Sequence, residues 1–189
     1  TAPHLKTGGN LNNTGLGKNV LAANTTGQQQ VSVGAISLDA NTTGNYNTAL
    51  GYATLSGNTT GDNNTAVGLS ALYSNTTADN NTAIGKETLL LNTTGTQNTA
   101  VGALALDANT TAANNTALGF SALSANTTGQ GNVALGAQAL ENATTADYNT
   151  AIGLQALDTC TTGSNNTSIG FYSSYSLTTG TKNTALGQS

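Results

Sequence analysis

The sequence predicts an all-β fold: a parallel β-solenoid (a β-roll or β-helix) of about eleven 17-residue coils without caps, forming a single domain over residues 1–189. Two observations support this. Glycines recur every 17 residues without an insertion or deletion, and branched aliphatic residues recur at the same period. A 17-residue unit is too short for two helices and their turns, which leaves a stacked β-coil as the repeating unit. The glycines are Gly17, Gly34, Gly51, Gly68, Gly85, Gly102, Gly119, Gly136, Gly153, Gly170 and Gly187.

Each repeat can be written as 17 columns, with this glycine, the corner glycine, in column five. The consensus is then N-T-A-[VIL]-G-x-x-A-L-x-x-N-T-T-[GA]-x-N, and the most complete copy covers residues 64–80. Column four is always Leu, Val or Ile, and column nine is Leu in each coil from Leu21 to Leu157. Full burial of such a side chain contributes about 1.5–3 kcal/mol. We therefore expect both columns to fill a narrow, continuous core.

Columns two and three belong to the strand that precedes the corner glycine. Column two is Thr in nine coils and Val at Val31 and Val133, and it lies two residues before column four, on the same side of the strand. This predicts half-buried threonines beside the core. Column three contains only Ala, Ser and Gly and is then expected to point outward. An outward strip of small residues predicts close packing against another surface.

Two corners are expected in each coil. The corner glycine directly follows the strand, where a tight corner needs a positive φ or a close approach of another backbone segment. Gly or Ala in column fifteen marks the second corner. Between the corners, a Thr-Thr pair in columns thirteen and fourteen is unbroken from Thr25-Thr26 to Thr178-Thr179. These β-branched residues predict an extended segment.

Asn dominates columns one and twelve. Amides stacked about 4.7–4.8 Å apart can hydrogen-bond to one another along a ladder. The substitutes in column twelve are the apolar residues Ala143, Cys160 and Leu177. The ladder of column twelve is therefore predicted to be internal rather than a displayed binding site.

Charged and aromatic residues define the expected outer surface. In the complete coils every Asp, Glu and Lys lies in columns six, seven, ten, sixteen or seventeen, and the aromatic residues share four of these columns. We expect these side chains to project outward, where aromatic rings can mark contact surfaces. In the last complete coil Ser174 replaces the usual leucine. The candidate assembly contact there consists of Phe171, Tyr172, Tyr175 and Leu177.

Composition argues against several classes of function. A net charge of −4 with only four Lys gives no stripe for nucleic acid, and no apolar run is long enough for membrane insertion. The single histidine, His4, the single cysteine, Cys160, and scattered acids do not converge on a catalytic site, so we expect neither enzyme activity nor a cofactor. Asp62 and Asp79 occupy column sixteen of adjacent coils, but no calcium-roll motif accompanies them, and we expect solvated acids rather than a metal site.

The two ends of the chain lie nearly in phase. Thr1 begins in column six and Ser189 ends in column seven. An uncapped solenoid offers its open strand edges to a neighbour. Two interpretations remain open: copies stack end to end as filament subunits, or the chain is a fragment of a longer repeat array.

The motif N-T-A-[VIL]-G-x-x-A resembles the N-S-V-A-I-G-x-x-S repeat of trimeric autotransporter adhesin heads. This resemblance implies a left-handed parallel β-roll assembled as a trimer. Those heads use shorter coils, and the additional element here is Asn-Thr-Thr-Gly, as in residues 126–129. The full unit is more similar to repeats that precede the tail-fibre chaperone domain of phage-like and bacterial surface proteins, which implies a surface location.

The expected function is a non-enzymatic, extracellular structural or adhesive fibre at a cell or virion surface. Its main partner is expected to be the chain itself, as an end-to-end filament or a trimeric stalk, with surface glycans or receptors as further partners. The hydroxyls of column thirteen, expected to point outward, are candidate glycan-bearing positions: Thr25, Thr42, Thr59, Thr76, Thr93, Thr110 and Thr127. The alternative is an ice-binding or other ligand-binding β-solenoid that uses Thr ladders. It is disfavoured because the paired threonines of columns thirteen and fourteen are adjacent and point to opposite faces.

Overall fold

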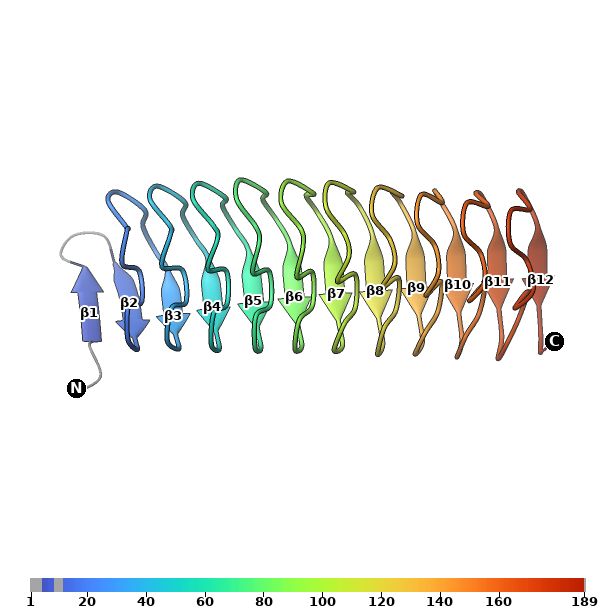
Figure 1. Cartoon of the computed structure of the whole chain (residues 1–189), viewed down its shortest axis with the longest axis horizontal. Coiled ribbons are helices and arrows are strands. Elements are labelled where there is room, and N and C mark those ends of the chain that lie inside the picture. Colours follow the sequence, from blue (N-terminus) through green and yellow to red (C-terminus); the bar gives the residue numbers. More distant parts are fainter. Residues whose placement is uncertain (1–4, 9–11, 189) are drawn as a thin grey trace.

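The computed structural model describes residues 5–8 and 12–188 and confirms the all-β parallel solenoid. All strands form one sheet in sequence order, and Figure 1 shows them in a single row along the molecule. Strands β2 to β12 are parallel and pair at an offset of 17 residues, so eleven strands bound ten full coils. The strands are β1 (Leu5–Gly8), β2 (Asn13–Leu16), β3 (Val31–Val33), β4 (Thr48–Leu50), β5 (Thr65–Val67), β6 (Thr82–Ile84), β7 (Thr99–Val101), β8 (Thr116–Leu118), β9 (Val133–Leu135), β10 (Thr150–Ile152), β11 (Thr167–Ile169) and β12 (Thr184–Leu186).

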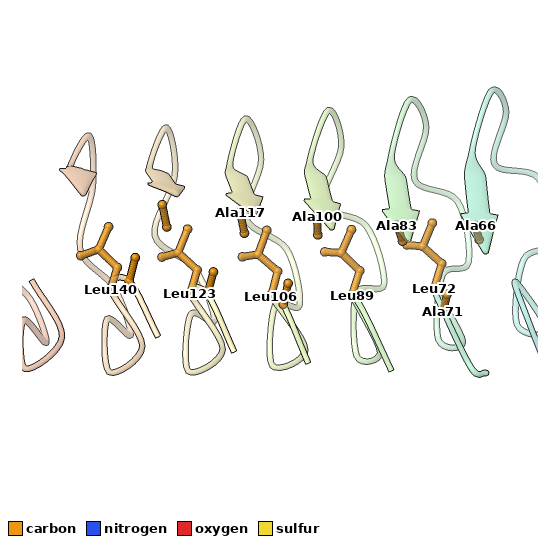
Figure 2. Packing of buried hydrophobic residues seen from close by; sticks show 14 of the residues in the cluster. Ala66, Ala71, Leu72, Ala83, Leu89, Ala100, Leu106, Ala117, Leu123 and Leu140 are labelled. Atoms are coloured by element: carbon orange, nitrogen blue, oxygen red, sulfur yellow. The ribbon is translucent and has the colours of Figure 1, made fainter. Parts of the chain in front are cut away.

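The core lies between the alanines of column three and the leucines of column nine, which face each other in Figure 2. Ala100 and Leu106 are fully buried, which confirms the prediction for column nine. The prediction that column four fills the core is wrong, because Leu50 is 47% exposed and Leu118 is 50% exposed. The outward direction predicted for column three is wrong as well, and no outer surface is needed to explain its small residues.

The physical reason for this inversion is the direction of column one. The Asn47 amide points inward, and its Nδ2 donates to the carbonyl of Gly61 in the same coil at 2.8 Å. Side chains alternate along a strand, so an inward column one places column three inward and columns two and four outward. The space opposite the column-nine leucine is then filled by the methyl group of an alanine.

The corner glycines have the two properties predicted for them. Gly85 has φ +140°, and a Cβ atom there would lie 2.7 Å from both the carbonyl carbon and the oxygen of Gly102 in the next coil. An L-residue would therefore be strained in its backbone and would also collide with the neighbouring coil.

The prediction of a second corner at column fifteen needs correction. Column-fifteen residues do not have a positive φ, and small residues occur there because the next coil is close: a Cβ on Gly44 would lie 2.5 Å from the oxygen of Gly61. The left-handed positions are instead columns seven, nine and seventeen, as in Ser70 (φ 54°), Leu72 (φ 52°) and Asn80 (φ 60°). This conformation costs an L-residue about 1–2 kcal/mol. Burial of the column-nine leucine offsets that cost.

The Thr-Thr segment bends and is not a strand, so the predicted extended segment is wrong. The amides of Thr42 and Thr43 both donate to the carbonyl of Thr59, at 2.9 Å and 3.2 Å. Two successive N–H groups that converge on one acceptor require the backbone to turn between them.

The expectation of uncapped ends is wrong at one end. Strand β1 pairs antiparallel with β2, with Leu5 opposite Leu16 and Gly8 opposite Asn13, and covers the first parallel strand. At the other end, β12 pairs with β11 only, within the part of the chain that the structure describes. Within residues 5–8 and 12–188, the first parallel strand is therefore covered by β1.

Truncation of two leucines tests which column is buried. Leu106→Ala removes a fully buried side chain and should lower the free energy of unfolding by about 2–5 kcal/mol. The control, Leu118→Ala, removes a half-exposed column-four side chain and should cost less than about 1 kcal/mol. Urea denaturation followed by circular dichroism measures both, and equal losses would contradict the orientation described here.

Candidate functional site

The strand face is a continuous surface of one chemical kind along the rod. We define it as the outward side chains of columns two and four on β2 to β12. Each strand contributes one Thr or Val in column two and one Leu, Val or Ile in column four. The exact register places identical columns next to each other from strand to strand. The members are Thr14, Leu16, Val31, Val33, Thr48, Leu50, Thr65, Val67, Thr82, Ile84, Thr99, Val101, Thr116, Leu118, Val133, Leu135, Thr150, Ile152, Thr167, Ile169, Thr184 and Leu186.

The strand face is apolar with regularly spaced hydroxyl groups. It contains no Asp, Glu, Lys or Arg. The column-two hydroxyls make no hydrogen bond to the protein within residues 12–188. The face can therefore offer methyl groups and free hydroxyls, which suits packing against another ordered surface and does not suit proton transfer or nucleophilic chemistry.

Sequence reasoning missed this face because apolar residues occur on both sides of the strand. Aliphatic residues in column four fit a core, and so do alanines in column three. The signal that could have found it is the exclusion of large residues from column three together with an amide in column one. Both features belong to a narrow interior.

The candidate glycan-bearing threonines of column thirteen are engaged in the fold. Thr76 Oγ1 donates to the carbonyl of Thr93 at 3.1 Å, and the same bond recurs along the column. Most of these side chains are half-buried, whereas the column-fourteen threonines, such as Thr77, are exposed. The hydroxyls of column thirteen are therefore bonded along the rod rather than free at the surface. A sugar on Oγ1 would also remove the donated hydrogen bond.

The candidate assembly contact near the C-terminal end is only partly a surface. Phe171 is exposed, and its ring meets that of Tyr172 edge-on at 4.2 Å, while Tyr172 and Tyr175 lie 5.1 Å apart. Leu177 packs instead against the buried core below these rings. The aromatic residues thus stay together on the last coils, and Leu177 serves the interior.

Most remaining aromatic residues project outward as predicted, including Tyr46, Tyr52, Phe120 and Tyr148. The acids are less uniform. Asp62 and Asp79 are half-buried, and each accepts a backbone N–H from the preceding coil, at 2.6 Å from Asn45 and 2.7 Å from Asp62. They therefore satisfy the backbone and are not simply solvated.

Column ten was expected to face solvent, but Asp158 is only 5% exposed. Burial raises the pKa of the Asp158 carboxyl, with a further contribution from the negative charge of Glu141 in the coil before it. Burial likewise raises the pKa of Asp107, whose Oδ1 is buried without a hydrogen-bond partner among the described residues. Side-chain hydrogen bonds from Tyr175 and Asn142 to the Asp158 carboxyl act in the opposite direction and lower its pKa.

Other expected features can be placed briefly. Cys160 is buried, and burial raises the pKa of its thiol. His4 lies outside the described residues. Residues 5–8 and 12–188 contain no group of three or more His, Cys, Asp or Glu side chains that could hold a metal ion. In the same ranges, no helix is long and apolar enough to cross a membrane.

The Asn ladder of column twelve is internal, as predicted. Asn75 Nδ2 donates to Asn58 Oδ1 at 2.8 Å and to the carbonyl of Ala78 at 3.1 Å. The ladder stops at Asn126, whose buried Oδ1 has no partner because Ala143 follows in the column. In that coil the carbonyl of Ala146 accepts a side-chain amide from Asn132 in column one, but the second amide, which column twelve supplies in other coils, is missing.

Extension of this ladder should stabilise the protein. Ala143→Asn supplies a donor to Asn126 Oδ1 and a second donor to the carbonyl of Ala146, while its own Oδ1 gains no amide donor because Cys160 follows in the column; the expected net gain in the free energy of unfolding is about 1 kcal/mol. Asn75→Ala should have the opposite effect and cost about 1–3 kcal/mol, because it unpairs buried groups. Urea denaturation compares the two, and a destabilising Ala143→Asn would show that the ladder cannot be extended.

The buried carboxyl of column ten should make stability depend on pH. The folded-state pKa of Asp158 is raised, so its contribution to stability is complete below the ordinary carboxyl pKa of 3.8 and is lost as pH rises through the folded-state value. Asp158→Asn should therefore be more stable than the parent protein near neutral pH and show a flatter stability profile above about pH 4. The matched control is Asp62→Asn. Column sixteen already contains an Asn at Asn45 in the preceding coil, so the same substitution is compatible with the fold there. Urea midpoints between acidic and neutral pH measure this, and identical profiles for Asp158→Asn and the parent would contradict it.

Comparison of the chain with known protein families, with curated proteins and with solved structures found no match. The function therefore has to be argued from the geometry of the rod and its faces.

Proposed function

We propose that this chain is a non-enzymatic structural component of an extracellular fibre at a cell or virion surface, where it self-assembles and presents an adhesive surface. The observation that supports this best is the long, uncharged strand face on a rod of identical coils. A rod with one repeated apolar face suits side-by-side assembly of copies. The resemblance to adhesin-head and tail-fibre repeats supports the surface location.

The internal bonding of the rod supports a mechanical role. Each coil is bonded to the next through its strand, its corner and two amide ladders, as in the bonds from Gly68 N to Leu50 O and from Asn64 N to Asn47 Oδ1. Ten spacings of about 4.8 Å give a length of about 48 Å. Bending such a rod would strain several ladders at once, which favours a stiff spacer.

Side-by-side assembly is better supported than simple axial stacking. An axial neighbour that continues the parallel sheet at β2 would have to displace β1, which pairs there over four residues. The strand face requires no such displacement. A stalk of laterally associated copies is therefore our preferred form of assembly. Surface glycans or receptors are proposed partners for the exposed column-fourteen threonines and aromatic rings.

Ice binding is a second candidate function, because Thr in column two and an aliphatic residue in column four point outward at i and i+2. Columns thirteen and fourteen do not offer such a pair of outward rows, because their threonines are adjacent in the chain and the column-thirteen hydroxyl, as in Thr76, is bonded to the backbone. Thermal hysteresis of the purified protein tests this candidate, together with the strand-face variants described below.

The primary proposal predicts a defined particle in solution. Light scattering and sedimentation should give a mass that is a multiple of 18.7 kDa, and small-angle X-ray scattering with negative-stain images should show rods about 48 Å long or longer. Lateral association increases the mass and cross-section at constant length, whereas axial association increases the length. A monomer that persists at high concentration would contradict the proposed self-assembly.

A further inference from the structure

The strand face is an uncharged surface that carries a row of large aliphatic side chains along the rod. Acids and lysines occur in columns six, seven, ten, sixteen and seventeen, and none occurs in columns two or four over eleven consecutive strands. Exposed sheet surfaces usually carry charges that prevent unwanted association. The exposed column-fourteen row is also uncharged, but it consists of polar threonines, whereas the strand face combines the absence of charge with a row of large aliphatic side chains. This combination favours a face that is covered in the assembled protein.

The exposed side chains on this face are large. Leu16, Leu50, Ile84 and Leu118 are each exposed by two fifths or more. Two residues further along each coil, column six adds exposed apolar groups in five coils. These are Tyr52, Leu69, Phe120, Leu154 and Phe171.

The extent of the face reaches the lower limit for a specific interface between two copies. Ten strand spacings of about 4.8 Å, with a width of about 10 Å, give an area on the order of 500 Å² per copy. Monomeric soluble proteins rarely leave much more than a few hundred Å² of apolar surface exposed in one patch. Contact between two such faces would bury roughly 1,000 Å² in total, which reaches the size of a specific interface.

The chemistry of the face also fits a second copy. An interface between identical chains places the same patch on both partners, so a charge would often meet its own kind. Methyl groups and hydroxyls avoid that repulsion. The 17-residue register gives both partners the same strand spacing, so their rows of side chains can interdigitate along the whole rod.

We infer that the strand face is buried against another copy of this chain, along the length of the rod, and that columns two and four form the assembly interface. This inference rests on the proposed self-assembly and adds the surface that mediates it. The C-terminal aromatic cluster lies outside this interface, apart from Phe171 at its edge.

The test compares two double variants of the full chain. Ile84→Lys with Leu118→Lys places two charges on the strand face, and Thr77→Lys with Thr111→Lys places two charges on exposed column-fourteen positions. Sedimentation over a concentration series should show association weakened about 10-fold or more by the first pair and little changed by the second. Circular dichroism and thermal unfolding check that both variants are folded.

A cysteine experiment keeps the inference testable if a lysine variant does not fold. In a Cys160→Ser background, Thr99→Cys places a thiol on β7, the middle strand of the face, and Thr94→Cys places one on column fourteen. Mild oxidation should give a covalent dimer of twice 18.7 kDa with Thr99→Cys and much less with Thr94→Cys.

The outcomes separate this inference from the function on which it rests. If the parent protein assembles but both lysine pairs act alike, or Thr99→Cys gives no dimer, the strand face is not the interface, although self-assembly stands. If the parent protein is a monomer, self-assembly itself is refuted. A monomer with thermal hysteresis that Ile84→Lys with Leu118→Lys abolishes would assign the face to ice instead of to a second copy.

Discussion

The inward carbonyl of column fifteen is the constraint on which the rest of each coil depends. In the coil that contains Gly61, this oxygen accepts Nδ2 of Asn47 at 2.8 Å and Nδ2 of Asn58 at 3.0 Å. A buried carbonyl left unpaired would cost about 1–3 kcal/mol, and the arrangement is repeated along the rod. In most coils two side-chain amides therefore point inward. One of them, in column one, sets the alternation of the strand that follows it.

The constant 17-residue period follows from the closeness of successive coils. A Cβ on Gly85 would touch the backbone of Gly102, and the bonds from Asn75 to Asn58 and from Thr76 to Thr93 each span 17 residues. An inserted residue would displace the strand, the corner and both amide ladders together. Left-handed residues such as Leu72 make the corners sharp enough to close so small a cross-section, and burial of their side chains supports that conformation.

The same regularity gives the surface its character. Because the interior is narrow and filled mainly by amides, alanines and leucines, the larger branched residues of the strand lie outside, in rows with the spacing of the sheet. In the complete coils, aromatic and charged residues are confined to columns six, seven, ten, sixteen and seventeen. A constant apolar strand face, next to surfaces whose residues vary from coil to coil, suits a rod that associates with other copies through the strand face and with other partners through the variable surfaces.

The sequence alone determined the period, the corner glycines, the leucine core of column nine and the internal Asn ladder of column twelve, because each is a repeated local pattern with one physical solution. It did not determine which side of the strand faces the core. Ala in column three and Val67 or Leu118 in column four are both compatible with burial, and alternation permits either choice. Only the tertiary structure decided this, through bonds from column one to a carbonyl fourteen residues later. The burial of Asp158 and the pairing of β1 with β2 likewise depend on contacts between segments that no repeat pattern encodes.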